Sequence, residues 1–151
     1  MTLTANTVAD REVAVGLLRE LLRSDRRLVG QASALRPVGT GRAWVRVADT
    51  PGADAWLIAW SPGSSVGTHD HGESHGVVHV LRGSLVERYW TSDDPAPRIR
   101  RLARRSTVDV PPDRVHDVAN ESGRPALSLH VYSPRLTTMS FYPPRASAES
   151  W

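Results

Sequence analysis

Short runs of β-forming residues, separated by turn-forming residues, fill the chain from residue 43 onward. This pattern constrains the fold more than any other feature, because short strands at regular spacing are typical of an antiparallel sandwich or barrel. We therefore expect a mainly β protein. The candidate strands are 43–48, 55–60, 66–70, 76–82, 85–90, 98–103, 107–110, 115–119, 126–132 and 137–142.

The N-terminal part of the chain has a helical pattern instead. Thr7 begins a Thr-x-x-Asp start signal, and Val13, Leu17 and Leu21 follow at helical spacing. We expect an amphipathic helix over 7–23, then a connection or a short helix plus loop over 30–42. A length of 151 residues is that of one domain. The expected layout is a single domain, 1–151, with a helical segment at about 7–35, a β-barrel at about 43–142 and a loosely ordered tail at 143–151.

A tight turn separates two of the candidate strands. Arg82 and Gly83 lie between 76–82 and 85–90, and glycine adopts the positive φ that two-residue turns require. We expect these two strands to pair as a hairpin.

No apolar run is long enough to cross a membrane. The longest, DAWLIAW and GVVHVL, fall far below the roughly 18 to 20 residues that a span needs. The first residues also show no basic stretch followed by an apolar one. We therefore expect a cytoplasmic monomer without a membrane partner.

The 19 basic residues are all arginine, and with 16 acidic residues the net charge is only +3. Because there is no lysine, this small excess raises the pI to about 10.1, which is a weak argument for nucleic acid. We expect no nucleic-acid partner. One basic cluster is either a solvated face or a surface for an acidic partner; it comprises Arg98, Arg100, Arg101, Arg104 and Arg105.

The chain contains no cysteine, which excludes disulfides, thiolate metal sites and a cysteine nucleophile. A metal must therefore be held by histidine or carboxylate side chains. His69 and His71 suit this role, because alternate residues of a strand point to one face and can share a metal ion. Asp70 then points the opposite way, and we do not expect it to be a ligand.

The residues around this histidine pair resemble the first signature of the cupin superfamily. The matching spacing is that of Gly63, His69, His71 and Gly83. Where the signature has a metal-binding glutamate, this sequence has Gly76, and Glu73 is the nearby carboxylate that could substitute. A site of three neutral imidazoles leaves the full metal charge to attract an anionic ligand such as a thiolate.

A second stretch resembles the second cupin signature in the spacing of Pro111, His116 and Asn120. Arg105 and Asp113 stand where that signature prefers glycine. The resemblance implies a cupin antiparallel β-barrel or jelly roll, here with a short N-terminal helical segment. It also implies that His116 is the third metal ligand.

A longer stretch resembles bacterial cysteine dioxygenase, a family of thiol dioxygenases within the cupins. The matching segments are WSPGSSVGTHDHGESHG, VLRGSLVE, VPPDRVHDVAN and SLHVYSP. In the last of these, Ser128, His130 and Tyr132 alternate along one strand, as the family's Ser-His-Tyr triad does.

This resemblance implies an iron enzyme. Fe(II) would be the cofactor, held by the three histidines, and the enzyme would convert L-cysteine and O2 to cysteine sulfinate. Tyr132 would donate a hydrogen bond to substrate or oxygen, and His130, aligned by Ser128, would hold the phenol in place.

The substrate carboxylate needs a cation, and arginine suits a bidentate contact. The resemblance favours Arg46, with Arg42 as the second choice. Trp44, two residues before Arg46, and Met139 are either pocket walls or plain core residues. In related mercaptopropionate dioxygenases the arginine follows the active-site tyrosine, where this chain has Phe141. That difference favours cysteine as the substrate.

Two alternatives remain open at this point: a dioxygenase for another small thiol such as 3-mercaptopropionate, and a non-catalytic metal-binding cupin.

The sequence also departs from the animal members of the family at one position beside the active-site tyrosine. Animal cysteine dioxygenases carry a cysteine that crosslinks to the active-site tyrosine, and Gly76 stands at that position. We therefore expect Tyr132 to be a free phenol.

Overall fold

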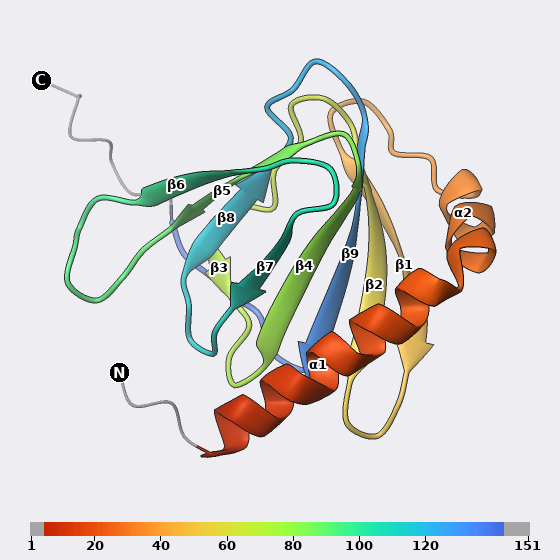
Figure 1. The fold of residues 1–151 in the computed structure, drawn as a ribbon. Coiled ribbons are helices and arrows are strands. Elements are labelled where there is room, and N and C mark those ends of the chain that lie inside the picture. The colour runs from red at the N-terminus through yellow and green to blue at the C-terminus, as the bar shows by residue number, and fades with distance from the viewer. Residues whose placement is uncertain (1–4, 144–151) are drawn as a thin grey trace, which may run out of the picture.

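The computed structural model describes residues 5–143, which form two helices and two β-sheets (Figure 1). The helices are α1 (Ala5–Arg23) and α2 (Asp25–Ser33). The first sheet has the order β1 (Arg42–Asp49), β2 (Asp54–Trp60), β9 (Ala126–Ser133), β4 (His75–Arg82) and β7 (Thr107–Val110). The second has the order β10 (Ser140–Phe141), β3 (His69–Asp70), β8 (His116–Ala119), β5 (Leu85–Tyr89) and β6 (Arg98–Leu102). All strand pairs in both sheets are antiparallel.

Strand β9 occupies the centre of the first sheet and is buried along its whole length. Helix α1 crosses the outer face of this sheet over β4 and β9 (Figure 1). Leu129 and Val131 pack outward into a core shared with Leu18 of α1. Because successive strand residues point to opposite faces, the residues that alternate with them, Ser128 and His130, point into the space between the sheets.

A second apolar core fills that space at one end of the barrel. Trp60 and Val80 from the first sheet pack there with Leu85, Leu102 and Val118 from the second. These side chains are almost fully buried, and burying a large aliphatic side chain contributes roughly 1.5–3 kcal/mol. The core therefore fixes the distance between the sheets and leaves the polar residues at the opposite end free to form a site.

Each candidate strand has a counterpart in the structure, although 66–70 shrinks to His69–Asp70 and 137–142 to Ser140–Phe141. The helix expected at 7–23 is present as α1. The stretch 30–42 was expected to hold a connection or a short helix, but the second helix begins earlier, at Asp25. In the part of the chain that the structure describes, no helix is long and apolar enough to cross a membrane. The tail predicted at 143–151 lies almost entirely outside the described residues.

The hairpin expected around Gly83 is wrong. Strands β4 and β5 lie in different sheets, so the turn carries the chain from one sheet to the other. Gly83 does have the expected positive φ, 72°. A Cβ here would lie 2.7 Å from the carbonyl oxygen of Pro125, so the glycine also allows a close approach between two backbones.

Arg105 and Asp113 explain the two departures from the second cupin signature. Their φ angles are 72° and 61°, and they are the two described non-glycine residues with positive φ. The left-handed conformation costs a residue with a Cβ roughly 1–2 kcal/mol. The backbone has thus kept the turns for which the signature uses glycine.

Candidate metal centre

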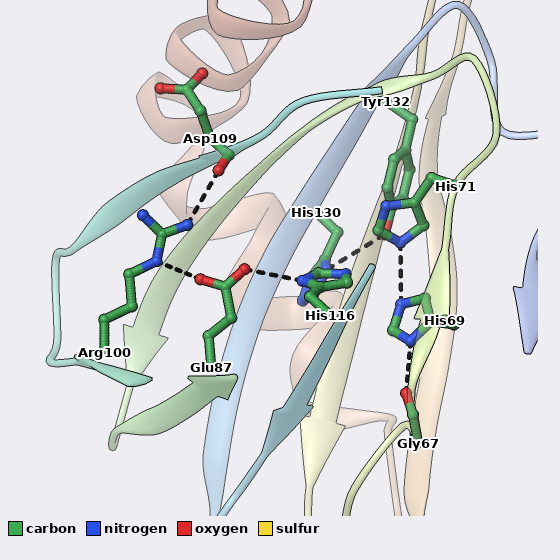
Figure 2. A network of polar contacts seen from close by, with 9 residues as sticks. All are labelled: Gly67, His69, His71, Glu87, Arg100, Asp109, His116, His130 and Tyr132. Carbon is green, nitrogen blue, oxygen red and sulfur yellow. Dashed lines mark hydrogen bonds and ion pairs between the residues drawn. The ribbon is translucent and has the colours of Figure 1, made fainter. Parts of the chain in front are cut away.

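Three histidines converge between the two sheets (Figure 2). His69 lies on β3 and pairs in register with His116 on β8, and His71 follows directly after the end of β3. One ring nitrogen of each lies within 4.8 Å of the others, and all three side chains are buried. Asp70 points away from this cluster, and its carboxylate accepts a hydrogen bond from the Tyr142 hydroxyl at 2.5 Å.

Neighbouring acceptors set the tautomers of two of these rings. His69 Nδ1 lies 2.7 Å from the carbonyl oxygen of Gly67, and His116 Nδ1 lies 2.9 Å from Glu87 Oε1. Because both partners only accept hydrogen bonds, both Nδ1 atoms carry the proton, and both Nε2 atoms present a lone pair.

The Nε2 atoms have the surroundings that a cation requires. His116 Nε2 is buried and has no hydrogen-bond partner among the described residues. His69 Nε2 faces His71 Nε2 at 3.1 Å. Buried polar atoms are almost always paired, so an unpaired nitrogen beside two facing ones fits a divalent metal ion bound between them. Glu73 is exposed and does not belong to the group.

Burial keeps these imidazoles in the form that binds metal. Together with the charges of the neighbouring histidines, it lowers the pKa of His69 to about 4 and that of His71 to about 2. Both rings are therefore neutral near pH 7, and neutral imidazole is the ligand form.

The Ser128, His130 and Tyr132 side chains form a chain of polar contacts along the inner face of β9. Ser128 Oγ lies 2.7 Å from His130 Nε2, and His130 Nδ1 lies 3.4 Å from the Tyr132 hydroxyl. The Tyr132 hydroxyl lies 3.5 Å from His71 Nε2. The chain of contacts thus ends beside the three histidines.

Trp60, which no motif in the sequence singles out, sets the direction of this chain of hydrogen bonds. Its Nε1–H donates to Ser128 Oγ at 2.8 Å, and an indole N–H can only donate. Among the described residues, the buried Ser128 hydroxyl has no hydrogen-bond acceptor other than His130 Nε2, so it donates there. His130 then carries its proton on Nδ1 and donates to Tyr132. The Tyr132 oxygen accepts that bond, and its own proton is left to point toward the histidine cluster.

Burial raises the pKa of Tyr132 above its ordinary value and lowers that of His130 to about 3. Tyr132 is therefore a neutral phenol, and His130 a neutral imidazole, near pH 7. Gly76 lies against the phenol: a Cβ at this position would be 3.3 Å from Tyr132 Cε1. The glycine leaves room for the ring beside β4.

A cavity of about 290 Å³ opens onto the histidines. Apart from the histidines, Tyr132 and Arg42, its walls are apolar. The lining residues are Arg42, Trp44, Trp56, Ile58, Val66, His69, His71, His116, Val118, His130, Tyr132, Leu136, Met139 and Phe141. The candidate pocket walls Trp44 and Met139 line the cavity, and Phe141 lines it too.

Arg46, the first choice for the carboxylate-binding arginine, does not line the cavity. Its side chain is 44% exposed and lies 3.5 Å from Asp49. Arg42, the second choice, lines the cavity and lies 5.5 Å from the ring centroids of Trp44 and Trp60. Both arginines lie on one face of β1, and the strand's position along the barrel decides which of them reaches the cavity.

Two facing antiparallel sheets with inward-pointing histidines define a class of protein, the double-stranded β-helix or cupin barrel. A Klebsiella pneumoniae protein described by that domain matches 75% of this chain and 94% of its own, with a TM-score of 0.63 and 16% identity. The protein TT1209 from Thermus thermophilus matches 66% of this chain and 90% of its own, with a TM-score of 0.58 and 30% identity. The expected cupin fold is confirmed.

Within that class, the sequence model of the family described as cysteine dioxygenase type I matches residues 6–145. The chain therefore belongs to the cysteine dioxygenase type I family. The cysteine dioxygenase type 1 proteins of Bos taurus and Homo sapiens are 31% identical to it over a 90-residue alignment, and the match covers 54% of this chain. That stretch is 45% of each relative, so the chain matches less than half the length of these curated proteins.

Proposed function

We propose that this protein is an Fe(II)-dependent thiol dioxygenase that converts L-cysteine and O2 to cysteine sulfinate. Both oxygen atoms are added to sulfur, so the reaction needs no further reductant. The observation that carries the proposal is the directed chain from Trp60 to Tyr132, which ends beside the three histidines. A metal-binding barrel without catalysis has no need for a phenol held in this way.

In this proposal His69, His71 and His116 hold the metal. Iron, when bound, supplies the redox chemistry that lets dioxygen react with a thiolate. Three neutral imidazoles leave the metal charge uncompensated within the group, which favours an anionic sulfur ligand.

Tyr132 is assigned the role of hydrogen-bond donor to the reacting groups. Its pKa is raised by burial, so the hydroxyl keeps its proton. His130 holds the phenol oxygen from the other side. The apolar walls of the cavity lower the local dielectric, which strengthens each polar contact inside.

Arg42 is assigned to the substrate carboxylate. It is the arginine among the described cavity-lining residues, and no described carboxylate lines that cavity to compete for it. A guanidinium makes a bidentate contact with a carboxylate, so one end of the substrate would be fixed on β1 while its sulfur faces the histidines.

The test is oxygen uptake by the Fe(II)-loaded protein with cysteine, 3-mercaptopropionate, cysteamine and homocysteine, with products identified by mass. We expect cysteine to give the highest kcat/KM and a product two oxygen atoms heavier. Faster turnover of 3-mercaptopropionate would assign the other thiol. No uptake with any thiol would leave a non-catalytic metal-binding cupin.

Arg42→Met tests the carboxylate contact. Losing hydrogen bonds to a charged group, about 1.5–3 kcal/mol, should lower kcat/KM for cysteine roughly 10- to 150-fold. Cysteamine, which has no carboxylate, should be turned over equally by both proteins. Arg46→Met changes the other arginine on the same face of β1 and should leave kcat/KM close to that of the wild type; the reverse result would reinstate Arg46.

A further inference from the structure

Glu87 is a fully buried carboxylate inside the barrel, on β5. Removing a charge from water is unfavourable unless both oxygens are paired, and here both are. Oε1 accepts the Nδ1–H of His116 at 2.9 Å, and Oε2 accepts the Nε–H of Arg100 (Figure 2). One carboxylate thus joins a histidine of the metal cluster to an arginine.

Arg100 is held in place from several directions. Strand pairing puts it directly opposite Glu87, its Nη2 donates to the Asp109 carbonyl oxygen at 3.1 Å, and its guanidinium lies 4.8 Å from the Tyr89 ring centroid. The other four arginines of the basic cluster are exposed. Arg100 is therefore the member of that cluster that faces the barrel interior.

The three histidines differ in what holds their outer nitrogens. His69 donates to a neutral carbonyl oxygen, and His71 Nδ1 has no hydrogen-bond partner among the described residues. His116 alone of the three donates to a carboxylate. An anionic acceptor raises the basicity of the opposite ring nitrogen and fixes its tautomer and orientation. His116 should therefore be the strongest electron donor of the three.

We propose that Glu87 and Arg100 are positioning residues that set the metal affinity of the site through His116, an inference that rests on the metal site of the proposed function. The cluster of three histidines contains no carboxylate. Glu87 supplies a negative charge next to it, through its contact with His116. Arg100 keeps the Glu87 carboxylate ionised and holds it so that one oxygen faces His116 Nδ1. His116 therefore presents Nε2 to the metal.

Glu87→Gln tests the proposal in the full chain, stripped of metal and titrated with Co(II) against a competing chelator. The amide can still accept the His116 proton but carries no charge. We expect Co(II) affinity to fall roughly 10- to 100-fold, the usual effect of losing such a partner. Glu121→Gln is the control, because Glu121 pairs with Arg88 at the surface, and its affinity should match the wild type.

The single variant leaves Arg100 partly buried without its carboxylate, which could weaken folding instead of metal binding. Glu87→Gln combined with Arg100→Gln removes both charges, and urea unfolding of the metal-free proteins measures the recovery. We expect stability to recover while Co(II) affinity stays low. Wild-type affinity in either variant would overturn the proposal and leave the pair a structural role only.

These measurements use neither a thiol nor oxygen. A wild-type chain that binds Co(II) but oxidises no thiol would overturn the proposed function and leave this inference standing. Unchanged affinity in Glu87→Gln, with normal thiol oxidation by the wild type, would overturn this inference alone.

Discussion

Trp60 fills the inner core and also fixes the direction of the hydrogen bonds that lead to Tyr132. Trp60→Phe keeps an aromatic ring but removes the donor, so the Ser128 hydroxyl is free to turn and the His130 tautomer is no longer set. We expect kcat to fall about 10-fold, within the range found for such outer partners. KM for the thiol should change less than kcat, because Phe keeps an aromatic ring beside Arg42 and Trp60 does not itself line the cavity.

Ser128→Ala should lower kcat by a similar factor, because it breaks the same chain at the next member. The double variant should be no slower than the worse single variant, since residues that act as one unit are not additive. Steady-state kinetics of the four proteins measure this coupling. Multiplicative losses would show that the two side chains act independently.

Single residues were predictable where a motif carried them. The alternation of His69 and His71 along a strand predicted two members of the cluster, and the resemblance to the second cupin signature predicted His116. Strand alternation also predicted the inner face of β9. The choice between Arg42 and Arg46 was not predictable, because the two share a face and differ only in position along the strand. Glu87 left a weaker signal: it shares strand parity with the buried Leu85, so an inward carboxylate could have been noticed.

Two turns carry strain that can be relieved. Arg105 and Asp113 are exposed and have positive φ, so glycine should suit either position better. We expect Arg105→Gly and Asp113→Gly each to raise the free energy of unfolding by up to about 1 kcal/mol. Gly83→Ala should do the opposite, because its Cβ would meet the Pro125 carbonyl oxygen at 2.7 Å. Urea denaturation checks all three, and lower stability in both glycine variants would contradict the strain argument.

The elements themselves were largely readable from the sequence, because alternation and turn chemistry are local. Which strands pair with one another could not be predicted from the sequence. A short turn normally joins neighbours in one sheet, yet the turn at Gly83 joins strands of different sheets. The sheet to which each strand belongs depends on which faces of β4 and β5 are buried by distant parts of the chain. The local residue pattern around Gly83 carries no information about that packing.

The stability of the whole metal-free protein should depend steeply on pH. Burial lowers the pKa of His69 to about 4, that of His71 to about 2 and that of His130 to about 3, from 6.5. Below pH 6.5 the unfolded chain therefore binds more protons than the folded one, and acid favours unfolding. Each histidine should remove up to about 1.4 kcal/mol of unfolding free energy per pH unit.

Urea unfolding between about pH 7.5 and 5.5 measures this slope, in a window above the ordinary pKa of 4.5 for glutamate. His130→Gln should flatten it by roughly one histidine's share. A stability that stays constant across this window would show that the buried rings accept protons in the folded state.

The central place of β9 has a consequence for how the protein is made. Residues Ala126–Ser133 lie between β2 and β4, which are synthesised much earlier. A nascent chain that has left the ribosome only as far as residue 120 already holds all three clustered histidines. It lacks the strand that joins the two halves of the first sheet, and both halves expose unpaired edges. The protein must therefore complete its barrel late in translation, and a ribosome that stalls before residue 126 leaves an aggregation-prone chain with its metal ligands present but unassembled.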